Sequence, residues 1–426
     1  MTPPPQIYLP RLIAWEVTRS CPLACKHCRA AAHLEPYAGE LSTDECRRVL
    51  DNIASFAKPT MILTGGEPML RTDIYVLADY AHRLGMPVVM APCGKFVDDE
   101  AVSRMKKAGI HCISISIDGA TAASHDAFRG IKGAFDFALQ ATEAAKRGGL
   151  DFQINTTITQ HNLAELPAIL DLAVRLGATV FNPFLLVPTG RGKELAGQEI
   201  SPEDYERTLH WLAGQEGRTD IRMRVTCAPH YTRVLHQRHL PKTRDSHLFL
   251  PGEKGPGEKG SDPLSVQGSD PLSPACAGPA CVPGAAEPED KRGGQSCPPR
   301  DAGPACDTGS GAAVVPPHSH PGQPAARGKG CLGGKAFAFI SHVGKVQICG
   351  FLETECGDLR RENLDFRKIW ETSSVFLAMR DVDRYHGKCG RCEYRRICGG
   401  CRARAFAMTD DYLAEEPFCI YQPRGK

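Results

Sequence analysis

The sequence predicts an α/β protein in which a parallel sheet, open or curled into a partial barrel of six strands, precedes a small cysteine-rich domain. Three observations support this prediction. Apolar segments of strand length alternate with helical ones from residue 12 to residue 186. Residues 251–330 contain 15 Pro and 15 Gly and interrupt that pattern. Residues 331–426 then hold eight of the 19 cysteines.

The predicted elements follow from local patterns along the chain. Residues 12–18 (LIAWEVT) are apolar and β-branched, as expected of a buried strand. Residues 43–57 form the first predicted helix, because Ser42 or Thr43 can cap its N-terminus and acidic residues follow. Strands and helices then alternate over residues 61–64, 73–84, 87–91, 98–108, 112–117, 134–146, 152–158, 163–176 and 180–186. In such a sheet, ligands collect at the C-terminal ends of the strands.

Charge and hydropathy exclude two classes of protein. The 51 basic and 49 acidic residues leave a net charge of +2, which argues against a strongly basic nucleic-acid-binding protein. No run of 18 apolar residues predicts a membrane span, and the N-terminus lacks the pattern of a signal peptide. We therefore expect a cytoplasmic protein whose cysteines bind metal rather than form disulfides.

The chain divides into three predicted parts. Residues 10–235 carry the alternation of strands and helices, and residues 331–426 carry the dense cysteines. Between them, residues 251–330 lack Phe, Tyr, Trp and Ile, so this stretch cannot bury enough apolar surface to offset the entropy lost on ordering. We expect a disordered, low-complexity insertion. Its four cysteines are expected to stay free thiols: Cys276, Cys281, Cys297 and Cys306.

Three cysteines directly follow the first predicted strand. Cys21, Cys25 and Cys28 stand at the spacing C-x3-C-x2-C. Three thiolates at this spacing can hold a [4Fe–4S] cluster and leave one iron without a protein ligand, open to a small molecule. The alternative is a zinc site that His27 or a distant residue completes.

A cysteine trio on the loop after strand one resembles the signature of radical S-adenosylmethionine (SAM) enzymes. The resemblance implies a partial (β/α)6 barrel and a cluster whose open iron binds SAM. It also implies cleavage of SAM to methionine and a 5′-deoxyadenosyl radical, which abstracts hydrogen from the substrate. Cys21, Cys25 and Cys28 then carry the catalysis, and a low-potential donor such as ferredoxin or flavodoxin supplies the electron.

Further segments resemble SAM-binding positions of this family. Its GGEP motif matches Gly65, Gly66, Glu67 and Pro68. The glycines allow backbone to approach a ligand closely, and Glu67 can accept a hydrogen bond from the SAM ammonium. By resemblance, Ser116 and Arg129 are candidates to hold the SAM carboxylate. Asp118 is a candidate for the ribose, and Asn155 is a further position near SAM.

The C-terminal cysteines form a second pattern. Paired C-x2-C knuckles by themselves are typical of a zinc ribbon. The whole pattern resembles the auxiliary-cluster (SPASM) domain of radical SAM enzymes, which implies one or two further [4Fe–4S] clusters. By the family arrangement, one cluster takes Cys389, Cys392, Cys398 and Cys419. A second takes Cys331, Cys349 and Cys401, and its fourth ligand stays open, with Cys356 as one candidate.

Residues 10–32 and 398–419 look like the tetrapyrrole branch of the family, and most like its haem synthases. This likeness implies oxidative decarboxylation of two propionates of iron-coproporphyrin III to vinyl groups. The alternatives are haem d1 synthesis, didecarboxysiroheme deacetylation, peptide or sulfatase maturation, and a non-catalytic scaffold. Arg29, Arg191 and Lys193 are candidates for the substrate carboxylates, and His230 for the substrate iron. For each of the four, a purely structural role is the competing interpretation.

Overall fold

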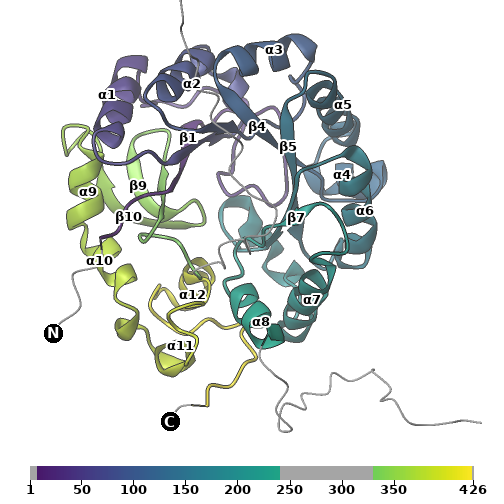
Figure 1. The fold of residues 1–426 in the computed structure, drawn as a ribbon, viewed down its shortest axis with the longest axis vertical. Coiled ribbons are helices and arrows are strands. Elements are labelled where there is room, and N and C mark those ends of the chain that lie inside the picture. Colours follow the sequence, from purple (N-terminus) through teal and green to yellow (C-terminus); the bar gives the residue numbers. More distant parts are fainter. Residues whose placement is uncertain (1–6, 240–329, 425–426) are drawn as a thin grey trace, which may run out of the picture. The chain divides into compact units, whose positions relative to one another are not determined.

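The computed structural model describes residues 7–239 and 330–424, so most of the predicted insertion, residues 251–329, lies outside the described residues. The described strands form one sheet with the order β10-β9-β8-β1-β2-β3-β4-β5-β6-β7. Strands β1 to β7 pair in parallel, and helices cover their outer face (Figure 1). The predicted α/β class with a parallel sheet is therefore confirmed.

The first part of the chain alternates strands and helices as expected. Its elements are β1 (Leu12–Thr18), α1 (Thr43–Ala54), β2 (Thr60–Gly65), η1 (Pro68–Leu70), α2 (Ile74–Arg83), β3 (Val88–Met90), α3 (Asp99–Lys107), β4 (Ile110–Ser116), α4 (Ala122–Arg129), α5 (Ala134–Arg147), β5 (Asp151–Ile158), η2 (Leu163–Glu165), α6 (Leu166–Leu176), β6 (Val180–Leu185), η3 (Gly190–Gln198), α7 (Pro202–Gln215), β7 (Arg222–Met223) and α8 (His230–His239). Each predicted strand and helix has a counterpart, with ends displaced by at most three residues.

Local capping explains two of the helices. Ser42 and Glu45 form a reciprocal capping box at the start of α1, which is the cap expected from the sequence. Thr121 and Ser124 form another at the start of α4, and Gly130 ends that helix at φ 72°. Helix α4 was not predicted, because its eight residues carry too short an apolar pattern to stand out.

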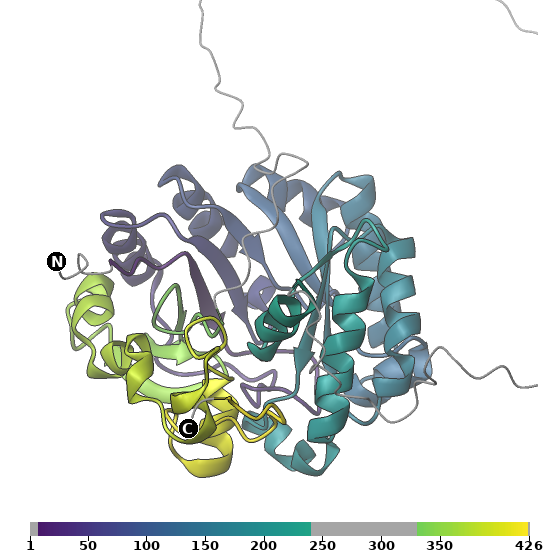
Figure 2. The same ribbon diagram turned by 60° about the horizontal axis from the view of Figure 1, so that its bottom comes forward.

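The cysteine-rich part does not stand apart from the sheet. Its elements are β8 (Phe337–Ile340), β9 (Lys345–Cys349), β10 (Leu352–Asp358), α9 (Phe366–Thr372), α10 (Ser374–Arg380), η4 (Val382–Arg384), α11 (Gly387–Arg391) and α12 (Arg402–Thr409). Strand β8 pairs in parallel with β1, from Leu12 opposite Phe337 to Trp15 opposite Ile340. The C-terminal elements, green to yellow, thus lie beside β1 (Figures 1 and 2). The sheet is continuous across the predicted domain boundary.

The two faces of the sheet differ in polarity. Ile154 of β5 and Phe181 of β6 belong to the hydrophobic core between the sheet and its helices. Asn155 and Asn182 alternate with them and therefore lie on the opposite side, which is called the inner face below. Among residues 7–239 and 330–424, none of the helices combines the length and apolar character that a membrane span needs.

One buried carboxylate on the inner face joins three parts of the chain. Glu16 of β1 is fully buried, and its Oε1 lies 2.9 Å from Arg19 Nε and 2.7 Å from His342 Nδ1. Its Oε2 lies 2.8 Å from Nη1 of Arg29 on the cysteine loop. Burial opposes ionisation of Glu16, but the Arg29 guanidinium, the hydrogen bond with His342 and the Arg19 guanidinium outweigh it and hold the pKa of Glu16 well below the usual range. Strand β1, the cysteine loop and the C-terminal part therefore share one charge centre.

A buried arginine makes a second junction. Arg404 of α12 is 1% exposed and donates hydrogen bonds to the carbonyls of Leu185 and Leu186 at the end of β6. Its Nη1 lies 3.1 Å from Glu416 Oε1, and its Nε lies 3.5 Å from Glu199 Oε1. These contacts satisfy a charge that would otherwise be costly to bury, and they fasten α12 to the far end of the parallel strands.

Replacement of Glu16 by Gln should lower the free energy of unfolding by about 3–5 kcal/mol, because it leaves two guanidinium groups beside a neutral group. Chemical denaturation at neutral pH measures this difference. The difference should shrink below the ordinary carboxyl pKa of 4.5, since a depressed pKa stabilises the fold only while Glu16 is ionised. The matched control is E353Q, at an exposed position of β10. Equal losses in the two variants would contradict the proposed role of Glu16.

Candidate functional site

The three N-terminal cysteines lie on the loop that leaves the C-terminal end of β1. Cys21 and Cys25 are each 8% exposed, and Cys28 is half-buried. The Cys21 backbone donates a hydrogen bond to the His33 carbonyl, and the Cys28 backbone donates to the Cys25 carbonyl. The loop therefore folds back on itself and turns all three side chains into one small cluster of buried residues.

Each of these three sulfur atoms accepts a hydrogen bond. The backbone N–H of Leu23 donates to Cys21 Sγ at 3.5 Å, and that of Ala32 donates to Cys28 Sγ at 3.4 Å. Arg129 Nη1 lies 3.5 Å from Cys25 Sγ. Burial raises the pKa of Cys21 to about 12, so its thiolate needs a bound cation to form. Donors aimed at every sulfur suit three thiolates of an iron–sulfur cluster.

The GGEP glycines bring the ends of β1 and β2 into contact. A Cβ on Gly65 would lie 2.2 Å from the Thr18 carbonyl oxygen, and one on Gly66 would lie 2.2 Å from that of Arg19. The Gly66 N–H donates to the Thr18 carbonyl at 2.9 Å. Only glycine fits at either position, because any side chain would overlap backbone of the segment that leads into the cysteine loop.

Glu67 ties this motif to the end of the next strand. Its fully buried carboxylate accepts hydrogen bonds from the backbone N–H of Met69 at 2.8 Å and from that of Cys93 at 2.5 Å. Pro68 opens the short helix η1 directly after it. Each carboxylate oxygen keeps a second lone pair, so a SAM ammonium remains a possible donor to Glu67.

Arg129 and Asp118 form a buried ion pair below the cysteine loop. Arg129 Nη2 lies 2.6 Å from Asp118 Oδ2, and Asp118 Oδ1 accepts from the Thr157 backbone at 2.7 Å. Burial alone would raise the pKa of Asp118, but Arg129 lowers it. The His27 ring stacks on Phe128 at a centroid distance of 4.4 Å. Arg129 thus already has a carboxylate partner and also contacts Cys25, while Asp118 is fully buried.

Ser116 and Asn155 lie side by side on the inner face. Their Cα atoms pair directly between β4 and β5. Asn155 Oδ1 accepts from Gln153 Nε2 at 2.9 Å and from Asn182 Nδ2 at 3.2 Å. The structure therefore brings these two candidate SAM contacts together, in a row of side-chain amides that continues onto β6.

The basic candidates for the substrate divide into structural and exposed residues. Arg29 is held by Glu16, and its guanidinium lies over the Phe339 ring at 4.4 Å. Arg191 donates to the carbonyls of Cys25 at 3.0 Å and Ala32 at 2.6 Å, within the cysteine loop. These contacts favour the structural interpretation of both arginines. Lys193 is exposed.

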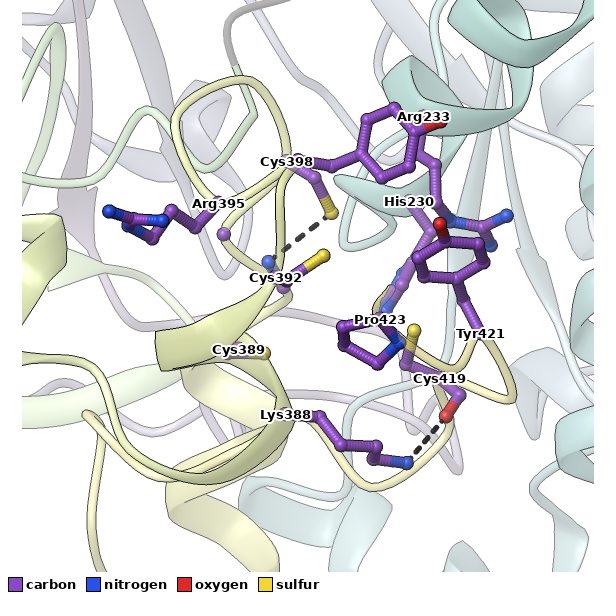
Figure 3. A pocket seen from close by; sticks show the side chains of 13 residues that line it. His230, Arg233, Lys388, Cys389, Cys392, Arg395, Cys398, Cys419, Tyr421 and Pro423 are labelled. Atoms are coloured by element: carbon purple, nitrogen blue, oxygen red, sulfur yellow. Dashed lines mark hydrogen bonds between the residues drawn. The ribbon is translucent and has the colours of Figure 1, made fainter. Parts of the chain in front are cut away.

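The four cysteines assigned above to the first auxiliary cluster share one pocket, on which their side chains converge in Figure 3. They are Cys389, Cys392, Cys398 and Cys419. Arg402 Nη2 and the Glu416 backbone N–H both donate to Cys389 Sγ at 3.4 Å. The Gly400 backbone donates to Cys398 Sγ at 3.4 Å. Charged and backbone donors on the sulfurs again suit thiolates.

His230 lies in this pocket, away from the inner face of the sheet. It is fully buried, and its Nε2 lies 2.9 Å from Glu416 Oε2. Burial alone would lower the pKa of His230, but the Glu416 carboxylate raises it well above the usual value. A hydrogen bond with His230 lowers the pKa of Cys419 against the effect of burial. The structure therefore favours a structural partner of Glu416 and Cys419 over a ligand of a substrate iron.

A cysteine of the first part of the chain joins the second C-terminal set. Cys227 shares a thiol hydrogen bond with Cys401, which raises the pKa of Cys227 and lowers that of Cys401. Burial raises the pKa of Cys349, and the nearby Cys331 and Cys401 raise it further. Cys349 in turn helps to raise the pKa of Cys227. Nothing in the local sequence around Cys227 links it to cysteines more than 100 positions later, so this contact could not be predicted from the sequence.

The backbone around Cys227 is specifically held. Cys227 adopts φ 61°, which is unusual for a residue with a side chain. Its carbonyl accepts hydrogen bonds from Tyr205 Oη at 3.1 Å and from Arg404 Nη1 at 3.1 Å. Cys356, in contrast, interacts with Ser373 of the α9–α10 junction. The contacts therefore single out Cys227, and not Cys356, as the neighbour of the second set.

The spacing of these side chains bears on the zinc alternative. Within the described ranges, no three His, Cys, Asp or Glu side chains lie close enough to hold a single metal ion. A zinc ion draws its ligands to about 2.0–2.3 Å from one centre. The described side chains thus form no ready-made tetrahedral zinc site.

Replacement of Arg191 by Gln should weaken iron retention at the N-terminal trio, because two carbonyls of the cysteine loop lose their charged donor. The measurement is the rate of iron loss to a chelator from the anaerobically reconstituted protein, which should rise several-fold. K193Q is the matched control, two residues away and exposed. If R191Q keeps its iron but loses affinity for substrate, Arg191 serves the substrate instead.

Comparison with known proteins agrees with this geometry. Residues 15–173 match the model of the radical SAM superfamily. The AdoMet-dependent heme synthase of Nitratidesulfovibrio vulgaris is 42% identical, over 97% of this chain and 93% of its own. The AdoMet-dependent heme synthase of Methanosarcina barkeri is 39% identical, over 98% of both chains.

A solved structure supports the fold over nearly the whole chain. Streptococcus suis SuiB, bound to its precursor peptide SuiA, aligns with a TM-score of 0.65 at 12% identity, over 97% of this chain and 77% of its own. At that identity the likeness concerns the fold alone. The chain belongs to the radical SAM superfamily, and within it to the family formed by its full-length heme synthase relatives.

Proposed function

We propose that this enzyme converts iron-coproporphyrin III to protohaem by oxidative decarboxylation of two propionate side chains to vinyl groups. The observation that carries the proposal is the 39–42% identity, over nearly the full length, to proteins named AdoMet-dependent heme synthase. A tetrapyrrole is accordingly the proposed substrate. We also propose a cytoplasmic location and a low-potential electron donor of the ferredoxin or flavodoxin type.

The residues at the C-terminal ends of β1 and β2 suit the SAM-binding role. Cys21, Cys25 and Cys28 would hold a [4Fe–4S] cluster. When bound, that cluster supplies the electron that cleaves SAM, and the resulting 5′-deoxyadenosyl radical takes a hydrogen atom from the propionate carbon next to the macrocycle. Next to this site, Gly65 and Gly66 allow the end of β2 to approach the backbone that follows β1. Glu67 links the ends of β2 and β3 through its hydrogen bonds.

The proposed reaction balances with one electron released per propionate. After hydrogen abstraction, the carbon–carboxylate bond breaks, CO2 leaves, and one electron passes to an acceptor as the vinyl double bond forms. Two propionates therefore consume two SAM molecules. We propose that the acceptor is an auxiliary [4Fe–4S] cluster in the C-terminal part of the chain.

Seven C-terminal cysteines together with Cys227 provide four ligands for each of two auxiliary clusters. One would take the four cysteines of the pocket in Figure 3: Cys389, Cys392, Cys398 and Cys419. The second would take Cys331, Cys349, Cys401 and Cys227. The thiol contact between Cys227 and Cys401 supports this fourth ligand, and Cys356 lacks such support.

The substrate assay tests the function directly. Anaerobically reconstituted enzyme with dithionite and SAM should convert iron-coproporphyrin III to a product lighter by two CO2 and two H2, as followed by mass spectrometry. C25A should abolish formation of 5′-deoxyadenosine, because the cluster loses one of its three ligands. SAM cleavage with unchanged porphyrin would exclude the haem synthase function and leave the other radical SAM activities open. No SAM cleavage by the wild type would exclude a radical SAM activity altogether.

The ligand set of the second auxiliary cluster has its own test. C227A should retain about four fewer iron atoms per chain than the wild type, because one cluster loses a ligand. C356A is the matched control and should keep all its iron. Iron analysis and electron paramagnetic resonance of the reduced protein provide the readouts. Wild-type iron content and spectrum in C227A would exclude Cys227 as a ligand.

A further inference from the structure

Strand β7 and the extended residues directly after it turn two arginines toward the inner face of the sheet. Met223 and Val225 pack against the hydrophobic core on the helix side. Because side chains alternate along a strand, Arg222 and Arg224 point the other way. Thr226 confirms this direction, since its Oγ1 donates to Asn182 Oδ1 at 2.8 Å on the inner face.

Arg224 stands level with the candidate SAM contacts on the neighbouring strands, and Arg222 lies one layer nearer the start of the strands, opposite Val180. The Arg224 backbone donates to the Phe181 carbonyl, which places Arg224 in the layer of Asn182. Asn182 is in turn paired with Asn155, and Asn155 with Ser116. One continuous inner face thus runs from the predicted SAM region on β4 and β5 to the arginines on β7.

These two arginines lack the counter-charges that the other inner arginines have. Arg29 and Arg129 each lie within 2.8 Å of a buried carboxylate oxygen. Within the described part of the chain, no ion pair or side-chain hydrogen bond involves Arg222 or Arg224. Both side chains are exposed and so are open to a ligand. Partial burial lowers the pKa of Arg224, and the adjacent Arg222 lowers it further.

The apolar surroundings suit a flat aromatic ligand. Phe184, two residues along β6 from Asn182, bridges to Thr226 of the arginine-bearing segment. Its ring lies 6.2 Å from that of Phe351, which comes from the β9–β10 connection. Phe184 lies on the same face of the sheet as the two arginines, and a face that offers both aromatic rings and guanidinium groups fits a macrocycle that carries carboxylate side chains.

We propose that Arg222 and Arg224 bind carboxylates of the tetrapyrrole, namely the two propionates that the reaction leaves intact. This inference rests on the proposed function. A guanidinium that pairs with a carboxylate stabilises its charged form and so opposes its loss as neutral CO2. The carboxylates that leave must therefore be free of such a pair, whereas those that stay can be anchored. Anchors on β7 would leave the opposite side of the macrocycle free to face the cysteine loop after β1.

Binding measurements without turnover test this inference. Without SAM or reductant, R222Q and R224Q should each weaken binding of iron-coproporphyrin III roughly tenfold to a hundredfold in a Soret absorbance titration, because each loses a charge-assisted contact. Protohaem keeps the retained propionates and should show the same loss. The matched control R218Q, at an exposed position on the connection from α7 to β7, should bind like the wild type. Since Arg222 is also exposed, its replacement should leave the fold intact.

Three outcomes separate the inference from its alternatives. Protohaem dimethyl ester, which lacks free carboxylates, should bind the wild type and the variants equally. Weaker binding of SAM, and not of porphyrin, would assign the arginines to the SAM carboxylate and overturn the proposal. Equal binding by R222Q, R224Q and R218Q would also overturn it, whereas a wild type that binds no iron-coproporphyrin III would count against the proposed function itself.

Discussion

The buried carboxylate of Glu16 is the interaction on which the rest of the arrangement depends. It lies within 2.9 Å of side-chain nitrogens from Arg19, Arg29 and His342. A buried carboxylate without partners would be strongly destabilising at this depth, so Glu16 depends on its contacts with all three side chains. Since Arg29 directly follows Cys28 and His342 follows β8, the same charge centre aligns the SAM-cluster loop with the C-terminal strands. This ionic junction thus acts together with the pairing of β8 and β1 to place the two cysteine regions.

The arginines of the interior separate into those with partners and those without. Arg129 and Arg191 donate to the cysteine loop, and Arg404 donates to the end of β6. Their guanidinium groups already have partners within the fold, so these arginines are poor candidates to bind a substrate carboxylate. Arg222 and Arg224 differ in having no such partner among the described residues. An exposed arginine that has no ion-pair partner among the described residues, on the face that carries the candidate SAM contacts, is open to an external carboxylate.

Local patterns predicted the parts of this structure that depend on neighbouring residues. The strand at Leu12–Thr18 and the cap at Ser42 follow from a few adjacent side chains, and the structure has both. The pairing of β8 with β1 joins residues more than 300 positions apart, so no local pattern reports it. The same holds for Cys227, whose role depends on Cys401. Arg191 was a candidate for the substrate because its sequence context shows a charge but not the carbonyls that the charge meets.

Two arginines of α12 connect the fold to the chemistry of the auxiliary sites. Arg402 donates to Cys389 Sγ of the four-cysteine pocket, and Arg404 donates to the carbonyl of Cys227 in the other set. Both side chains are almost fully buried, so their positive charges are little screened by water. A cation next to a cluster favours its reduced, more negative state and raises its reduction potential. In the proposed reaction the substrate radical must give up an electron as CO2 leaves, and a cluster held at either cysteine site, beside a buried arginine, would be suited to accept it.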